Sequence, residues 1–293
     1  MGRRGLSQLV SRSGPLNFLR GILRGQRPIL IDYPGRFAPR YGYGAPPHRE
    51  LYRLLDDGRA AYAGFLSRCL ELSDALRAIP AAADPASTEP SWINGFLSGL
   101  DAAALYATLT FTNPERYVEI GSGHSTRFAR RAIRDHRLRT RITSIDPNPR
   151  VEIDSISDEV VRARFEETDL SSVASLRPGD VLFVDGTHRC FTGSDVTVTF
   201  LEVLPRLAAG VRVHVHDVFL PYDYPPEWKD RYYSEQYLLA AYLLGGAHRV
   251  RVTFPSAFVS GESDLLSILG PLWDAIGRDE IDRRGCSFWM ERT

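Results

Sequence analysis

The stretch YVEIGSGHST, residues 117–126, decides how this chain folds. Val118 and Ile120 are β-branched and bracket an acid, a pattern typical of a short buried strand. Gly121 and Gly123 follow at once, at a place where the backbone can turn sharply and let a ligand approach closely. The stretch therefore predicts a buried strand that ends in a glycine turn.

A helix is expected directly after this turn. Ser125 or Thr126 can cap a helical segment that runs through residues 127–133. Strand, glycine turn and helix in this order form the nucleotide-binding layout of doubly wound α/β folds. A pair of glycines alone does not say which nucleotide is bound, so the neighbouring residues have to decide.

A second strand is predicted at residues 141–146, and it ends in Asp146. An acid at this place can accept hydrogen bonds from a ribose diol, as in NAD or in S-adenosylmethionine (SAM). A dinucleotide fingerprint has a third glycine, where this chain has Thr126. Glu119 precedes the first glycine, and a carboxylate there suits a cofactor with a cationic amino-acid end better than it suits a pyrophosphate.

The two segments resemble the first two motifs of the class I SAM-dependent methyltransferases. The resemblance implies that SAM is the cofactor, with Glu119 facing its amino-acid end, the glycine turn its backbone side and Asp146 its ribose. In the loop after a third candidate strand, residues 160–165, Asp169 is our candidate for contact with the adenine, although it can equally cap the following turn. The predicted cofactor-binding residues are Glu119, Gly121, Ser122, Gly123, Asp146, Asp169 and Asp185.

Polar side chains also end the next two predicted strands, residues 180–188 and 211–218. The first is almost continuously apolar, as expected for a parallel strand buried on both faces, and it delivers Asp185 to the carboxyl edge of the sheet. The second delivers His216 and Asp217 to the same edge. Carboxylates and an imidazole can bind a divalent cation, so these three residues are the predicted metal ligands.

Residues 183–188 and 214–218 resemble the strand-end motifs of a methyltransferase group that includes bacterial sugar and natural-product O-methyltransferases. Several members carry a magnesium site at the positions of Asp185, His216 and Asp217. His216 departs from the better-known pattern, which has an oxygen ligand there, and magnesium strongly prefers oxygen. The resemblance therefore leaves open whether this chain binds magnesium, another metal or none.

The predicted function is transfer of a methyl group from SAM to a small-molecule acceptor, most simply at a hydroxyl. His188 or His216 can serve as general base, and a metal held at Asp185 can take over part of that work. One alternative is a non-haem iron oxygenase that uses these two imidazoles and this carboxylate. The other is a catalytically silent scaffold that binds a partner.

Bulk properties are those of a soluble globular protein. The chain has 293 residues, 43% of them hydrophobic and 25% charged, and its formal net charge is +0. This balance gives no overall field that attracts nucleic acid, so no nucleic-acid partner is expected. Cys69, Cys190 and Cys286 are far apart and odd in number, which predicts neither a disulfide framework nor a zinc site and is consistent with a cytoplasmic location.

Two regions are predicted along the chain. Residues 1–90 form an N-terminal extension of helices and loops, which begins with a basic segment at residues 1–25 and is a candidate for oligomerisation of the chain with itself. Residues 91–293 form the methyltransferase domain, and residues 81–90 are the linker. No apolar run approaches the length of about 20 residues that a membrane span needs.

The predicted fold class is α/β, a Rossmann-like, doubly wound sheet of seven strands with an N-terminal helical extension. Six strands are expected to be parallel, and the last, at residues 287–290, is expected to be inserted antiparallel as in class I methyltransferases. The loop at residues 220–228 is rich in proline and aromatic residues and is the predicted wall of an acceptor pocket.

Overall fold

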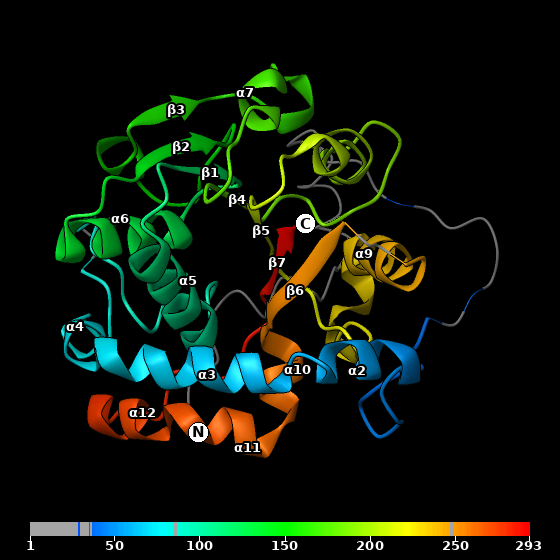
Figure 1. Cartoon of the computed structure of the whole chain (residues 1–293), viewed down its shortest axis with the longest axis horizontal. Coiled ribbons are helices and arrows are strands. Elements are labelled where there is room, and N and C mark those ends of the chain that lie inside the picture. The colour runs from blue at the N-terminus through cyan, green and yellow to red at the C-terminus, as the bar shows by residue number, and fades with distance from the viewer. Residues whose placement is uncertain (1–28, 30–34, 36, 85–86, 247–248) are drawn as a thin grey trace, which may run out of the picture.

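The computed structural model describes residues 29, 35, 37–84, 87–246 and 249–293. A seven-stranded sheet in the order β3-β2-β1-β4-β5-β7-β6 forms its centre (Figure 1). Neighbouring strands are parallel from β3 to β5, and β7 is antiparallel to both β5 and β6, which confirms the predicted fold class. The strands are β1 (Arg116–Ile120), β2 (Arg141–Ile145), β3 (Glu159–Val161), β4 (Val181–Val184), β5 (Arg212–Val215), β6 (Val250–Pro255) and β7 (Phe288–Arg292).

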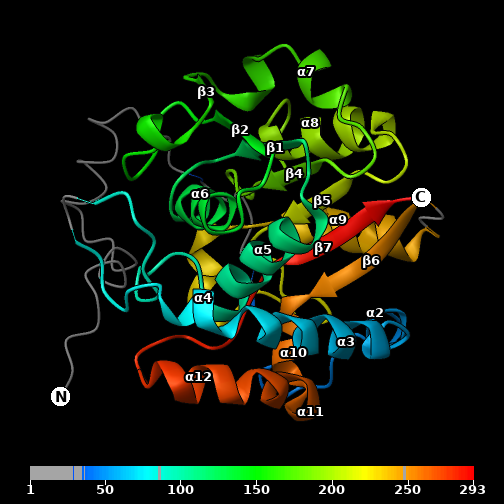
Figure 2. The same ribbon diagram turned by 60° about the vertical axis from the view of Figure 1, so that its left-hand side comes forward.

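The helices precede, connect and follow these strands (Figures 1 and 2). Helices α5 and α6 pack against each other beside the strands, and α3 and α4 contact the helices that follow β6. The α-helices are α2 (Arg49–Asp56), α3 (Arg59–Cys69), α4 (Ser73–Arg77), α5 (Gly99–Thr112), α6 (His124–His136), α7 (Ser171–Ala174), α8 (Asp195–Val198), α9 (Glu235–Leu244), α10 (Ser256–Gly261), α11 (Ser263–Leu266) and α12 (Gly270–Ile276).

The register of the central strands brings their carboxyl ends together. Ile120 at the end of β1 pairs with Ile145 of β2 on one side and with Val184 of β4 on the other. Val184 in turn pairs with Val215 of β5. The residues that follow these four ends therefore meet at one edge of the sheet, where open α/β folds bind their ligands.

One expected strand is shorter in the structure, and two helical segments are irregular at one end. Strand β3 ends at Val161, because Phe165 turns into the core as the first residue of a short 3₁₀ helix. The helical segment that begins with α8 continues as a π turn and a 3₁₀ turn, and the 3₁₀ turn contains Pro205, which has no N–H to donate. Helix α5 begins only at Gly99, after an irregular loop that lines the site described below.

The described helices before residue 90 share one apolar core with the sheet. Leu51, Leu55 and Leu66 are buried, and the Tyr62 ring meets the rings of Phe254 and Phe258 edge-on. A domain boundary near residue 90 remains a prediction. The basic segment at residues 1–25 lies outside the described residues. None of the described helices is long and apolar enough to cross a bilayer.

Candidate active site

The turn after β1 is possible only for glycine. Gly121 has φ +79°, a left-handed conformation that costs other residues free energy. A Cβ atom on Gly121 would lie 1.9 Å from the carbonyl oxygen of Asp185, at the end of the neighbouring strand β4. Backbone of β1 and β4 therefore comes into direct contact at this edge, as the glycine pattern predicts.

Hydrogen bonds fix the remainder of the turn. The Ser122 N–H donates to Asp146 Oδ2 over 2.8 Å, so the acid after β2 holds the turn after β1. The Gly123 N–H donates to Thr126 Oγ1 over 3.0 Å. Helix α6 begins at His124, and Thr126 stabilises its start from inside the first turn. The helix therefore starts after Gly123 rather than at Ser125 or Thr126. Thr126 lies inside the first turn, and its hydroxyl accepts the hydrogen bond from the Gly123 N–H.

Glu119 lies in the interior and does not reach the cavity beside the turn. Its side chain is fully buried, and its carboxylate accepts hydrogen bonds from the Tyr117 hydroxyl over 2.9 Å and from the Thr126 hydroxyl. The expectation that it faces a cofactor is therefore corrected: Glu119 points along the strand into the core. Burial raises its pKa to about 7, although the hydroxyl hydrogen bonds oppose the shift.

Replacing Glu119 by Gln is expected to flatten part of the pH dependence of stability. A carboxyl whose pKa is raised by folding stabilises the native state fully below its unfolded pKa, and that stability is lost as the pH rises through the folded pKa. Wild type should therefore lose about 2–3 kcal/mol of unfolding free energy between about pH 5 and about pH 8 that E119Q does not lose. Urea unfolding at both pH values measures this, and a constant difference would contradict it.

A cavity of about 960 Å³ opens beside the glycine turn. Gly121, Ser122, Gly123, Asp146 and Asp185 all line it, so the register brings together five of the seven predicted cofactor-binding residues. Its far end is formed by the loop after β3, and this side of the cavity is lined by Arg164, Phe165 and Glu166.

Asp169 does not line this cavity, so the expected adenine contact is corrected. Its carboxylate accepts hydrogen bonds from the backbone N–H and from the hydroxyl of Ser171, which lower its pKa. Asp169 therefore caps the start of α7. This is the capping role that the sequence left open, and Phe165 and Glu166 stand where Asp169 was expected.

The predicted catalytic and metal-binding residues form one cluster at the ends of β4 and β5. His188 Nε2 lies 3.1 Å from Asp185 Oδ1 and 3.5 Å from Asp217 Oδ2. His216 Nδ1 lies 3.3 Å from Asp217 Oδ1 and 3.7 Å from Asp185 Oδ1. Both imidazoles therefore present one ring nitrogen to the same pair of carboxylates.

Two buried carboxylates that the sequence analysis missed stand behind these imidazoles. Glu235, at the start of α9, has its Oε2 2.9 Å from His188 Nδ1. Asp101, in the first turn of α5, has its Oδ2 3.7 Å from His216 Nε2. Their sequence signal was an acid at the buried start of a mostly apolar helix, where a carboxylate needs a partner.

Charge coupling within the cluster outweighs burial. Burial opposes the charged form of both imidazoles, but the neighbouring carboxylates raise the pKa of His188 and of His216 well above the usual value. Burial likewise opposes ionisation of Asp185 and Asp217, and the imidazoles nevertheless lower the pKa of both acids. The cluster is thus a set of charged groups that stabilise each other in a buried place.

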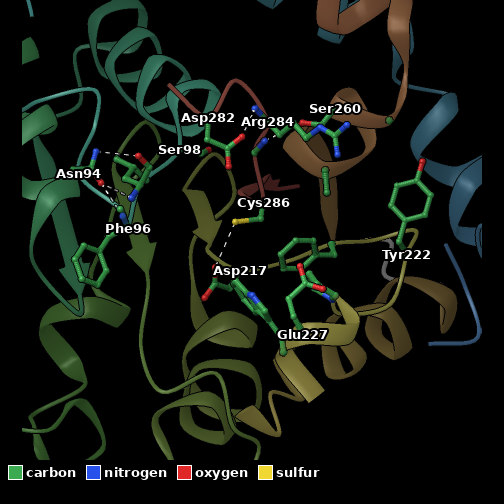
Figure 3. Close-up of a pocket in the computed structure, with 18 of the residues that line it drawn as sticks. Asn94, Phe96, Ser98, Asp217, Tyr222, Glu227, Ser260, Asp282, Arg284 and Cys286 are labelled. Atoms are coloured by element: carbon green, nitrogen blue, oxygen red, sulfur yellow. Dashed lines mark hydrogen bonds between the residues drawn. The ribbon is translucent and has the colours of Figure 1, made fainter. Parts of the chain in front are cut away.

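A second cavity, of about 720 Å³, lies on the other side of the cluster (Figure 3). Asp217 lines it, as does Cys286, whose thiol lies 3.4 Å from Asp217 Oδ1. Burial raises the pKa of this thiol well above the usual value, so Cys286 is a neutral neighbour. Phe96 and Leu97 line both cavities, and the two spaces therefore meet at this loop.

Much of the wall of this second cavity comes from the predicted acceptor loop. Tyr222, Pro225, Glu227 and Trp228 of this loop line the cavity, and so does Phe219 directly before it. That the loop contacts an acceptor remains a prediction. The opposite wall includes the irregular loop before α5. There the Asn94 side chain accepts hydrogen bonds from backbone N–H groups and fixes the loop in place.

The donor set fits a divalent cation. Ligand atoms of Asp185, His216 and Asp217 all lie within 4.8 Å of one another. Carboxylate oxygen with imidazole nitrogen suits manganese, iron or zinc better than magnesium, which prefers oxygen alone. Asp101 stands behind the other nitrogen of His216, as carboxylates commonly do behind metal-binding histidines.

Comparison with known proteins supports the predicted class. A family model described as a methyltransferase domain matches residues 118–218, which run from β1 through β5 and include the whole cluster of strand-end residues. The search among curated proteins found no match.

Solved structures that resemble the chain are also methyltransferases. An O-methyltransferase from Bacillus cereus in complex with S-adenosylhomocysteine is 16% identical, with 78% of this chain and 90% of that chain covered and a TM-score of 0.39. The Podospora anserina methyltransferase PaMTH1, also bound to S-adenosylhomocysteine, is 18% identical, with 72% and 93% covered and a TM-score of 0.38. A structure titled as a magnesium and SAM complex of cmcI is 14% identical, with 67% and 72% covered and a TM-score of 0.38.

The family match and the strand order together define the class. This chain contains a SAM-dependent methyltransferase domain with the class I strand order, recognised over residues 118–218. The two alternatives raised by the sequence, an iron oxygenase and a silent scaffold, gain no support from the match.

Proposed function

We propose that the protein transfers the methyl group of SAM to a hydroxyl of a small-molecule acceptor. One observation carries this proposal. Asp185 lines the cavity beside the glycine turn, Asp217 lines the second cavity, and both contact His188 and His216 between the two. Two substrate-sized spaces on either side of one polar cluster are what a two-substrate transfer requires.

SAM is assigned to the cavity beside the glycine turn. Both carboxylate oxygens of Asp146 already accept backbone hydrogen bonds, from Ser122 and Asn148, and their remaining lone pairs face the space for a ribose diol. Gly123 leaves that space open, since a Cβ there would meet only Val151, at 4.0 Å. Glu119 then acts indirectly, by fixing the Thr126 side chain that holds this glycine.

The acceptor is assigned to the second cavity, with its hydroxyl beside Asp217. The sulfonium already activates the methyl group, so the main task of the protein is to hold nucleophile, methyl and sulfur in line at near-contact distance. Phe96 and Leu97 stand where the two spaces meet and exclude water from the point of transfer.

The acceptor hydroxyl must also lose a proton, and the Asp217 carboxylate, which lines the second cavity, is placed to accept it. His188 lines neither cavity, and its charged imidazole stabilises the Asp185 and Asp217 carboxylates from behind. Its Nδ1 lies 2.9 Å from the buried Glu235 carboxylate, which fixes the ring orientation and directs Nε2 toward Asp185 and Asp217. Asp101 stands behind His216 at a longer distance, with its Oδ2 3.7 Å from His216 Nε2. Glu235 and Asp101 are therefore positioning residues, and neither touches a substrate space.

Asp185, His216 and Asp217 are the residues that would hold a divalent cation. When bound, such an ion supplies positive charge that stabilises the oxyanion of the acceptor and lowers the pKa of its hydroxyl. The carboxylate of Asp217 would remain part of the wall of the second cavity and would orient the hydroxyl.

Cofactor binding is the direct test. Isothermal titration of wild type with SAM is expected to show one site, and Asp146→Ala should weaken binding at least about tenfold because the ribose loses its acceptors and the turn loses the hydrogen bond to Ser122. Asp169→Ala, outside the cavity, is the matched control and should bind as wild type does. Absence of heat with both SAM and S-adenosylhomocysteine would refute the function.

The setting of the enzyme follows as part of the proposal. All three cysteines are free, which suits a cytoplasmic location. The acceptor is a small molecule rather than nucleic acid, because the site is a pair of cavities of small-molecule size and the chain has no net positive charge. Association of two copies through the N-terminal extension remains a prediction.

A further inference from the structure

The second cavity has an excess of negative charge that methyl transfer does not use. Besides Asp217, the acids Glu227, Glu280 and Asp282 line it, and Arg284 is the one basic side chain among the lining residues. Apart from Asp217, none of these charged side chains takes part in an ion pair within the described part of the chain. The acids are therefore free to pair with charge on a ligand.

The labelled acids lie around the Asp217 end of the cavity. Figure 3 shows Asp282 on one side of the neighbouring pair Cys286 and Asp217, and Glu227 on the other side. The Arg284 guanidinium extends toward Ser260, away from Asp217. Asp282 Oδ1 accepts a hydrogen bond from the backbone N–H of Arg284 over 3.1 Å, and Oδ2 has no hydrogen-bond partner among the described residues.

Aromatic rings form much of the surface between these charges. Tyr43, Trp92, Phe96, Phe219, Tyr222 and Trp228 all line the cavity. Aromatic faces attract cations, and arginines of the chain itself already lie over two of these rings, Arg231 over Trp228 at 3.8 Å and Arg150 over Phe96 at 5.0 Å. Carboxylates at the same rim form charge-assisted hydrogen bonds with ammonium groups. A cavity lined by rings and by an excess of carboxylates therefore favours a cationic ligand with apolar ring surface over a neutral one, and excludes an anionic one.

We propose that the acceptor carries a protonated amine in addition to the hydroxyl that is methylated. The amine lies between the rim carboxylates of Glu227 and Asp282, and the hydroxyl lies beside Asp217. This inference rests on the proposed function, because it takes the second cavity as the acceptor site. It adds the chemical class of the acceptor, an amino alcohol or aminophenol of a size that fits about 720 Å³.

The test compares phenols that carry short tails of different charge. Tyramine, para-ethylphenol and phloretic acid share a phenol with a short tail that is cationic, neutral or anionic. Each is titrated into full-length protein saturated with S-adenosylhomocysteine. Tyramine is expected to bind at least about tenfold more tightly than para-ethylphenol, phloretic acid should bind most weakly, and the preference should shrink as salt is raised because the rim acids are exposed.

Charge variants make the test specific to these residues. Glu227→Gln and Asp282→Asn keep the size of each side chain and should each reduce the preference for tyramine over para-ethylphenol severalfold, whereas Arg284→Gln should increase it. Glu202→Gln removes the same charge from an exposed position outside both cavities and should change nothing.

The outcomes separate the two proposals. If S-adenosylhomocysteine does not bind, the proposed function fails at its first step. If it binds and tyramine is not preferred, or if E227Q and D282N leave the preference unchanged, the amine assignment is overturned while methyl transfer stands.

Discussion

Asp217→Asn is expected to lower kcat for methyl transfer at least about a hundredfold while SAM affinity stays within about twofold of wild type. Asp217 is the one member of the Asp185–His216–Asp217 set that lines the acceptor cavity. Its carboxylate lies 3.3 Å from His216 Nδ1 and 3.5 Å from His188 Nε2. An amide at this place keeps the shape but removes the negative charge that pairs with both imidazoles and that would hold the proposed cation.

This prediction is measured as S-adenosylhomocysteine formed with an acceptor that wild type methylates, beside SAM affinity by calorimetry. Metal content after exposure to manganese, determined by plasma mass spectrometry, gives a second readout and should fall in D217N. Asp274→Asn, an exposed position on α12, is the matched control. A variant that turns over within tenfold of wild type, or loses SAM affinity in parallel with kcat, would show that Asp217 is not at the reacting end.

Gly121→Ala is expected to remove SAM binding and to destabilise the fold by about 3 kcal/mol or more. The alanine Cβ would lie 1.9 Å from the Asp185 carbonyl oxygen and 2.8 Å from its carbonyl carbon. The ends of β1 and β4 would have to separate, and this displaces Asp185 itself. The positive φ at this position adds strain for any residue with a side chain.

Gly123→Ala is the matched comparison, because its Cβ would meet only Val151, at 4.0 Å. G123A should therefore keep close to wild-type thermal stability, although the added methyl occupies space assigned to SAM and should weaken its binding. Thermal unfolding of both variants, with and without S-adenosylhomocysteine, separates the two effects. Equal stability of G121A and G123A would refute the close contact between β1 and β4.

The sequence determined the class of this protein and the edge of the sheet at which it works. Apolar runs predicted the central strands. A nearly continuous run is expected of a parallel strand that is buried on both faces. Each of the four central strands is followed directly by glycine, carboxylate or imidazole, and parallel register forces those residues together. Gly121, Asp146, Asp185 and His216 could be grouped for this reason without knowledge of any contact.

The tertiary structure decided which way each side chain points and what stands behind it. Glu119 turns inward because alternation along β1 sends it to the face where Tyr117 and Thr126 supply hydroxyls. Asp169 turns to its own helix start because Ser171 offers two nearby donors. Such choices depend on partners that only packing brings close.

The same holds for the groups that complete the site. Glu235 and Asp101 are distant in sequence from the histidines that they orient, and helices α9 and α5 reach these histidines only once they pack beside the sheet. The acid-rich rim of the acceptor cavity likewise combines Glu227 with Asp282, from segments on either side of β6. The sequence pattern shows which residues lie at the ends of the strands. Which loops and helices pack around those ends is decided only when the chain folds.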